Sequence, residues 1–284
     1  MNPTMSATRI GIDRGWTEFR QSLTGPDAYS FHVLLAVVIL IVLWFQRHHS
    51  LPGTSLSLAT VALPGVIGML VAFNTTLSAA LVVATEREDG TLLRMKAAPH
   101  GATAYVIGAS VRVPLATVLG ILFILIPGLI LFPHLSGAGL GGWATLVWVL
   151  VLGLLATMPF GMIVGALAKD PRTPTQAAGL VGAVLIAISG IFYPISGMPG
   201  WLHPVAEVFP YYWLGLGMRS ALLPGSAAHL ELTGSWQHPA TAGVLGAWAV
   251  VGLLLAPTVL RRMTRRESGS SVEASRQRAA QRVG

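Results

Sequence analysis

The sequence predicts an all-α integral membrane protein with six transmembrane helices, an N-terminal amphipathic interfacial helix, and short re-entrant or outer helices between the fifth and sixth spans. Three observations lead to this fold class. Of the 284 residues, 53% are hydrophobic and only 10% are charged, and the mean hydropathy is +0.68. The apolar residues form six long runs, and the Lys and Arg residues gather on one side of these runs. So few ionic groups cannot coat a water-soluble globule of this size.

Composition also argues against several classes of function. The net charge is +7, but the basic residues lie in loops and in the tail, not on an aromatic-interleaved face, which disfavours a nucleic-acid partner. The absence of cysteine excludes disulfides, thiolate metal sites and cysteine nucleophiles. Residues 1–30 carry Asp13, Glu18 and Asp27 and lack the pattern of a cleaved signal peptide. We therefore expect the first span to direct membrane insertion.

Residues 1–28 are predicted to form a cytoplasmic interfacial helix. Ile12, Trp16, Phe19 and Leu23 recur at helical spacing, while the charged residues fall mostly on the rest of the helical wheel. A stripe that contains Trp and Phe suits the headgroup boundary of a membrane. The alternative is an ordinary amphipathic N-terminus with frayed ends.

Six stretches within residues 29–260 are apolar enough to span a bilayer. A spanning helix needs about 20 residues, because it rises about 1.5 Å per residue across about 30 Å of hydrocarbon. The first and fifth stretches are short, and the third is long enough to tilt. The six stretches are residues 29–45, 61–84, 104–132, 143–168, 177–194 and 243–260.

The distribution of Lys and Arg predicts the orientation. All but three of these residues lie in the N-terminal segment, in the loop 85–101, near residues 169–172, or in the tail 261–284. The exceptions are Arg47 and Arg219 on the opposite side and Arg112 within a span. Because positive charge stays inside, both termini are expected to be cytoplasmic in a multi-pass protein of the plasma (inner) membrane. Attraction to anionic lipid explains the basic cytoplasmic tail 261–284.

A charged island separates the second and third spans. Asp89-Gly90 is a turn dipeptide, Thr91 is a typical helix N-cap, and residues 92–98 favour a two-turn helix that Pro99 ends. Its surface is too small for a domain, so we expect the loop 85–101 to dock on another protein. The loop contains Glu86, Arg87, Glu88, Gly90, Thr91, Leu92, Met95 and Pro99.

The outer loop 195–242 is long and only partly polar. It and the residues just before it combine prolines with aromatic residues, followed by a helix-compatible run over residues 214–223. This mixture suits short helices that dip into the outer leaflet or cap the bundle, since irregular backbone at membrane depth must be covered. An aromatic belt at the outer interface is the alternative. The prolines and aromatic residues of this region include Tyr193, Pro194, Trp201, Tyr211 and Tyr212.

Several kinds of chemistry find no support in the sequence. None of the six stretches contains Asp or Glu, which argues against an ion-coupled carrier. Neither Lys96 nor Lys169 completes a P-loop, so no nucleotide site is expected in this chain. His48 with His49, and His203 with Glu207, supply too few ligands for zinc. We expect no catalytic residue, no bound metal and no cofactor of its own.

Polar and small residues interrupt the spans at three places. Asn74, Thr75, Thr76 and Ser78 lie near the middle of the second span, where they either form interhelical hydrogen bonds or face a substrate. Arg112 is expected to extend its side chain to the cytoplasmic interface. The spacing of Gly161 and Gly165 allows another helix to approach closely.

The order of these features resembles the ABC-2 type permeases, the membrane subunits of ATP-binding-cassette exporters. The resemblance covers nearly the whole chain. Within the family, the chain resembles the drug and antibiotic-resistance branch. The matching residues are Glu86-Arg87-Glu88-Asp89-Gly90-Thr91 with Ala98-Pro99, Ser189-Gly190-Ile191-Phe192-Tyr193-Pro194, Met198-Pro199-Gly200-Trp201, Pro210 and Arg219.

The resemblance implies partners and a mechanism. Two copies of a cytoplasmic ATPase, which would hold ATP and Mg, are expected to contact the loop 85–101 and the N-terminal helix. A second permease, most simply an identical one, would complete the pathway. Its outer gate would include Tyr193, Pro194, Trp201, Tyr211 and Tyr212. Glu86, Arg87 and Glu88 would hold the loop by charge pairs, and Leu92 and Met95 would fill an apolar cleft of the ATPase. Rocking of these loops would open the pathway alternately to the two sides.

The expected function is ATP-driven efflux of a hydrophobic or amphipathic compound, a drug or antibiotic. Export of a lipid or a lipid-linked glycan is the nearest alternative. An ion-coupled secondary transporter, a membrane enzyme, and a sensor that signals the presence of an antibiotic are further alternatives. A carrier would transport without ATP, whereas an enzyme would turn over substrate with no ATPase present.

Overall fold

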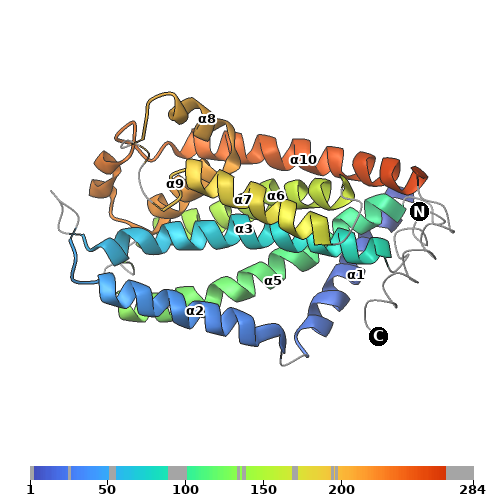
Figure 1. Cartoon of the computed structure of the whole chain (residues 1–284), viewed down its shortest axis with the longest axis horizontal. Coiled ribbons are helices and arrows are strands. Elements are labelled where there is room, and N and C mark those ends of the chain that lie inside the picture. The colour runs from blue at the N-terminus through green and yellow to red at the C-terminus, as the bar shows by residue number, and fades with distance from the viewer. Residues whose placement is uncertain are drawn as a thin grey trace.

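The structure, a computed structural model, describes residues 3–24, 27–50, 56–88, 101–132, 135, 139–167, 172–192, 195 and 198–266, and this part of the chain is a helical bundle (Figure 1). Its elements are α1 (Pro3–Ser22), α2 (Asp27–Gln46), α3 (Leu58–Glu88), α5 (Gly101–Leu131), α6 (Gly139–Leu167), α7 (Arg172–Ile188), α8 (Leu202–Val208), α9 (Pro210–Leu222), the 3-10 helix η3 (Gly225–Leu230) and α10 (His238–Arg266).

Each of the six apolar stretches of the sequence overlaps a helix, although α7 ends at Ile188, before the end of the fifth stretch. Among the described residues, four helices are long and apolar enough to cross a membrane, namely α3, α5, α6 and α10. The apolar parts of α2 and α7 are shorter, at His32–Gln46 and Gly179–Ile188. Together these helices make the chain a multi-pass membrane protein.

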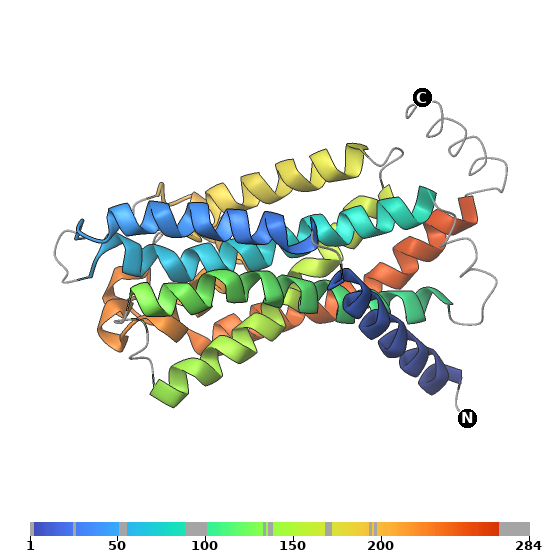
Figure 2. The same ribbon diagram turned by 90° about the horizontal axis from the view of Figure 1, so that it is seen from below.

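The long helices run side by side along the longest axis of the molecule, while α1 is inclined to them and crosses one end of α5 (Figures 1 and 2). Helix α6 packs against α3, α9 and α10, and α3 also contacts α5 and α7. Helix α2 lies along α5 and α3. The interior of the bundle is therefore built around α3 and α6, with α9 inserted beside them.

The buried residues form two clusters along the bundle. The larger one surrounds α9 and includes Ile67 and Tyr211, and the smaller one lies toward the other end and includes Val83, Tyr105 and Met162. Large apolar side chains also point outward from several helices. Because a membrane protein presents such groups to lipid, this surface is what a bilayer requires. Examples are Leu34, Phe45, Ile126, Ile130, Leu180 and Leu254.

Helix α1 carries large apolar side chains on its exposed surface. Ile12, Trp16 and Leu23 are exposed, and Trp16 packs on Phe19 with the ring centroids 5.8 Å apart. Gly11 and Gly15, which lie beside this stripe on the helical wheel, face α5. The exposed apolar stripe of α1 therefore remains available to a membrane surface.

The beginning of α1, the end of α3, the beginning of α5 and the end of α10 all lie at the same end of the bundle (Figures 1 and 2). This common end is the one that the charge distribution assigns to the cytoplasm. The predicted docking residues Gly90, Thr91, Leu92, Met95 and Pro99 lie outside the described residues, as does the tail from residue 267. For Glu86, Arg87 and Glu88 the structure describes only the backbone, which forms the last turn of α3.

Candidate functional site

The outer cap, defined as residues 198–231, closes the end of the bundle away from the termini (Figure 1). It contains α8, α9 and η3, so the outer loop forms short helices and not merely an aromatic belt. Phe209 is extended, with ψ 147°, and Pro210 opens α9 at a position where its missing N–H would have no helical partner. Every residue of α9 except Ser220 is buried. Helix α9 is thus a buried element that packs against α3, α6 and α10.

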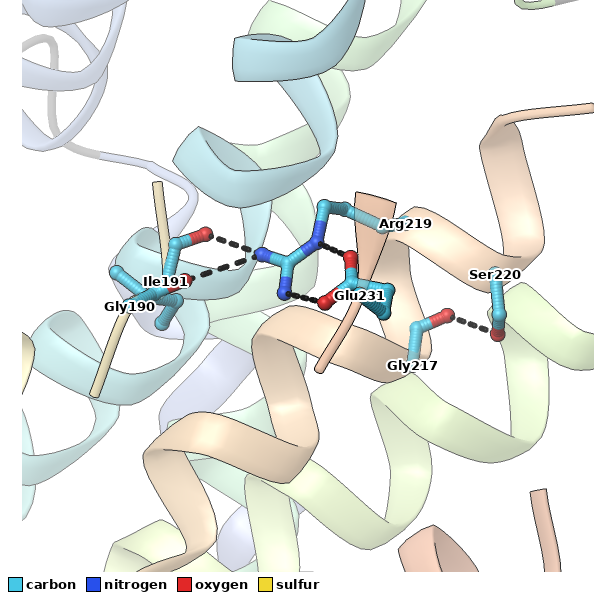
Figure 3. Close-up of polar contacts among 6 residues, drawn as sticks. All are labelled: Gly190, Ile191, Gly217, Arg219, Ser220 and Glu231. Atoms are coloured by element: carbon cyan, nitrogen blue, oxygen red, sulfur yellow. Dashed lines mark hydrogen bonds and ion pairs between the residues drawn. The ribbon is translucent and has the colours of Figure 1, made fainter. Parts of the chain in front are cut away.

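A buried ion pair holds the cap together. Arg219 of α9 and Glu231, which follows η3, have side chains that are only 1% and 2% exposed. The Nε atom of Arg219 donates to Oε1 of Glu231 at 2.5 Å, and Nη2 donates to Oε2 at 3.1 Å (Figure 3). This bidentate geometry is the strongest form of an arginine–carboxylate contact.

The same guanidinium also binds the chain that follows α7. Its Nη1 atom donates to the carbonyl oxygens of Ile191 at 3.0 Å and Gly190 at 3.2 Å (Figure 3). Gly190 has φ +59°, a left-handed conformation that glycine adopts most readily. Arg219 therefore joins three segments, α9, the residue after η3, and the chain leaving α7. The sequence placed Arg219 on the outer side but offered no sign that Glu231 was its partner.

A second polar junction joins the cap to the spanning helices. The hydroxyl groups of Tyr211 and Thr76 lie 3.0 Å apart, and Thr76 Oγ1 also donates to the carbonyl oxygen of Thr157 at 3.3 Å. Helices α9, α3 and α6 meet at this point. Burial raises the pKa of Tyr211, and burial followed by the nearby Glu231 carboxylate raises the pKa of Tyr212 to about 12. Both hydroxyls therefore remain neutral at physiological pH.

The structure divides the polar patch of the second span into two parts. Thr75 and Thr76 are buried, and Thr75 Oγ1 donates to Thr117 Oγ1 on α5 at 3.5 Å. Interhelical hydrogen bonding accounts for these two threonines. Asn74 is half-buried and Ser78 is exposed on α3. Only these two residues of the patch are accessible to a substrate in the single chain.

The residues predicted for an outer gate have different environments. Trp201 precedes α8 and is 70% exposed, whereas Tyr211 and Tyr212 are buried in α9. Tyr193 and Pro194 lie outside the described residues. His203, considered as a metal ligand from its sequence position, has Nε2 within hydrogen-bonding distance of the carbonyl oxygens of Ile195 and Met198. Its surroundings give it a structural role in the cap.

At the opposite end of the bundle, glycines bring α1 against α5. A Cβ atom added at Gly11 would lie 2.6 Å from the carbonyl oxygen of Ala104, and one added at Gly15 would collide with the carbonyl oxygen of Gly108. Small residues four apart allow two helix backbones to meet in this way. The sequence contains this signal, because Gly11 and Gly15 are small residues four positions apart.

Charged residues surround this crossing. Nε of Arg14 lies 2.5 Å from Oε1 of Glu18, and Nη1 of Arg112 on α5 lies 2.9 Å from Oε2 of the same carboxylate. The Arg14 guanidinium also lies over the ring of Tyr105, at 5.6 Å from its centroid. Arg112 thus reaches the interfacial helix itself, where Glu18 is its partner. Sequence reasoning expected Arg112 to extend toward the interface but did not identify this ion pair.

The predicted close approach at Gly161 and Gly165 is found between α6 and α3. A Cβ atom at Gly165 would lie 2.6 Å from the carbonyl oxygen of Ala80, and one at Gly161 would collide with the carbonyl oxygen of Thr76. Thr76 therefore takes part in both the helix crossing and the junction with Tyr211. The outer cap is in this way coupled to the centre of the bundle.

Comparison with known families gives a match over most of the chain. The family model described as ABC-2 type transporter matches residues 8–223, which run from α1 to the end of α9. No curated protein matches the chain.

Proposed function

Because the chain belongs to the ABC-2 type transporter family, we propose that it is the permease subunit of an ATP-binding-cassette exporter. The family match over residues 8–223 is the observation that carries this proposal. In the proposed arrangement α2, α3, α5, α6, α7 and α10 span the plasma membrane, and both termini are cytoplasmic. A separate ATPase subunit, present in two copies, binds ATP and Mg and supplies the driving force.

The loop 85–101 is the proposed contact with the ATPase. It joins the end of α3 to the beginning of α5, so a displacement of the loop acts on both helices at once. Helix α3 packs against α6 and α9, and α5 is held to α1 by the glycine crossing and the Glu18–Arg112 pair. These contacts support a rigid-body transmission from the loop to the outer cap.

Two copies of the chain are proposed to form the pathway, with the outer cap as its external gate. Arg219 fastens α9 to Glu231 and to the chain after α7, which supports movement of the cap as a unit. Asn74 and Ser78, the accessible members of the polar patch, are the proposed contacts with the transported compound. Their mild polarity within an apolar helix suits a hydrophobic or amphipathic cargo, and we propose a drug or antibiotic.

The first experiment isolates the tagged chain from its native membranes in mild detergent and identifies the proteins that accompany it by mass spectrometry. We expect a soluble P-loop ATPase in near-stoichiometric amount. If the chain is recovered alone or only with itself, the proposed coupling has no partner. Transport in vesicles without ATP and its loss on collapse of a proton gradient would then identify an ion-coupled carrier.

The role of the loop is tested by Glu88→Lys. Reversing this charge at the end of α3 is expected to abolish ATP-dependent export while the protein still inserts into the membrane. Glu273→Lys is the matched control, because it makes the same charge change in the tail 261–284, for which no contact with the ATPase is proposed. Export that survives Glu88→Lys unchanged would remove the coupling role of this residue.

A further inference from the structure

A pocket lies where α1, α2 and α5 meet. It has a volume of about 200 Å³ and is lined by the last turns of α1, the first turns of α2 and the middle of α5. Most of its walls are apolar. The lining residues are Phe19, Ser22, Leu23, His32, Ala116, Leu119, Gly120 and Phe123.

Two polar residues, Ser22 and His32, lie in the pocket wall, but the pocket remains largely apolar. Ser22 directs its hydroxyl to the carbonyl oxygen of Phe19 at 2.6 Å, so the group is already satisfied within α1. The imidazole of His32 packs against Gly120, where an added Cβ would lie 2.5 Å from Cδ2 of the ring. Gly120 thus leaves space for the ring in the wall. What remains is a concave apolar surface that suits hydrocarbon.

The position of the pocket is that of the inner membrane interface. Helix α2 has 20 residues, which at about 1.5 Å per residue is just enough to cross about 30 Å of hydrocarbon. His32 lies five positions after Asp27, the first residue of α2, and is therefore only about 8 Å into the membrane by the same rise. Helix α1, with Trp16 exposed, occupies the adjoining interfacial layer.

A basic residue follows the lining residue Phe19 in the last turn of α1. Arg20 lies in the last turn of α1, next to Phe19 and three residues before Leu23, and it is exposed. None of the ion pairs within the described part of the chain includes Arg20. A guanidinium at this level of the membrane attracts an anionic head group. Apolar wall and cationic rim together match an anionic amphiphile.

The size of the pocket limits what can enter it. An apolar cavity of about 150 Å³ accepts a benzene-sized molecule, whereas pockets that enclose drug-sized ligands measure about 300 to 1,000 Å³. The volume of about 200 Å³ therefore accepts part of a larger molecule. A segment of an acyl chain, with the rest of the lipid remaining in the bilayer, meets this limit.

We propose that the pocket holds a segment of one acyl chain of an anionic phospholipid from the cytoplasmic leaflet, with the phosphate head group against Arg20. The lipid fills the corner between α1, α2 and α5 and steadies the interfacial helix against the bundle. This site lies apart from the outer cap and from the polar residues of α3. Its occupation requires neither an ATPase nor a transported compound.

The acyl-chain site is tested with the full chain purified in mild detergent, incubated with phosphatidylglycerol or phosphatidylcholine, and examined by native mass spectrometry. Ser22→Phe fills the pocket from its exposed edge. Gln21→Phe adds the same ring at the neighbouring exposed position, which does not line the pocket. We expect Ser22→Phe to lose the most tightly held phosphatidylglycerol, and Gln21→Phe to retain it. Equal retention by both variants would overturn the proposal.

The head-group contact is tested by Arg20→Gln. This substitution is expected to reduce the preference for phosphatidylglycerol over phosphatidylcholine about fivefold, the contribution of one basic side chain near an anionic surface. Arg9→Gln removes the same charge from an exposed position near the start of α1 and is expected to leave the preference unchanged. Equal binding of the two lipids by the unaltered chain contradicts an anionic ligand.

A Ser22→Phe variant that loses only a second copy of the chain, with its lipid count unchanged, would assign the pocket to a protein contact and overturn the proposal.

Discussion

At the scale of single residues, the outer cap depends on one guanidinium. Arg219 satisfies two carboxylate oxygens and two backbone carbonyls in a site from which solvent is excluded. A buried ion pair adds little to folding stability compared with well-packed apolar residues of similar volume. Removing only one partner, however, leaves a buried charge that neither water nor protein compensates. The effect of a substitution at Arg219 therefore depends on what remains opposite it.

Arg219→Met is expected to destabilise the protein by about 3 kcal/mol or more, because Glu231 would be left buried and unpaired. The double variant Arg219→Met with Glu231→Leu should recover part of this loss, but not the hydrogen bonds to Gly190 and Ile191. Thermal unfolding in detergent, followed by size-exclusion chromatography, measures both. Arg9→Met is the exposed control. A double variant less stable than Arg219→Met would contradict the unpaired charge as the cause.

The hydroxyl of Thr76 gives a second prediction at this scale. Thr76→Val keeps the shape of the side chain but leaves the Tyr211 hydroxyl buried without its partner, which costs about 1 to 3 kcal/mol. Adding Tyr211→Phe should reduce the loss, with a coupling energy of about 0.5 to 3 kcal/mol in a double-mutant cycle. Stability in detergent provides the measurement. Strictly additive effects would show that the two hydroxyls do not interact.

Tyr212 is the matched control for Tyr211. Its hydroxyl is buried and has no hydrogen-bond partner among the residues that the structure describes. Removing an unsatisfied buried hydroxyl is neutral or favourable. Tyr212→Phe should therefore leave the apparent melting temperature unchanged or raise it, whereas Tyr211→Phe should lower it.

At the scale of the elements, backbone contact through glycine determines how closely the helices approach. Gly161 and Gly165 bring α6 against α3, while Gly11 and Gly15 bring α1 against α5. In a membrane, lipid solvates an apolar surface as well as another helix does, so close packing of this kind supplies much of the association energy. A single added methyl group is therefore enough to disturb a crossing.

Gly161→Ala is expected to lower stability, because the new Cβ would collide with the carbonyl oxygen of Thr76, a backbone atom that cannot rotate away. Gly179→Ala makes the same chemical change in α7, where no atom of the described residues lies within 4 Å of the added Cβ, and should be neutral or stabilising. Parallel thermal unfolding curves compare the two. Similar losses for both variants would point to a general effect of replacing glycine.

At the scale of the whole molecule, the ends of the bundle differ in what they carry. One end combines α1 with the helix ends that flank the loop 85–101, and the other carries the outer cap (Figure 1). The charge distribution assigns the first end to the cytoplasm. Because the chain has no cysteine, single introduced cysteines can test this assignment directly.

Ser235→Cys and Ser270→Cys are predicted to differ in labelling. Ser235 is exposed beyond the outer cap, and its cysteine should react with a membrane-impermeant maleimide in intact cells. Ser270 belongs to the tail expected in the cytoplasm, and its cysteine should react only after the cells are lysed. The reverse pattern would invert the proposed orientation.

The sequence by itself determined the helical membrane class and the positions of the apolar helices, because length and hydropathy decide what a bilayer accepts. For the outer loop it left short helices and an aromatic belt as alternatives. It also indicated the close approach at Gly161 and Gly165, since small residues four apart share one face of a helix. Only the tertiary structure decided that Arg219 pairs with Glu231, that Arg112 pairs with Glu18, and that Thr76 meets Tyr211. Arg219 and Glu231 are 12 positions apart in the sequence, and Thr76 and Tyr211 are 135 positions apart. Their contacts arise from the packing of whole helices. The spacing of residues along the sequence does not predict such contacts between helices.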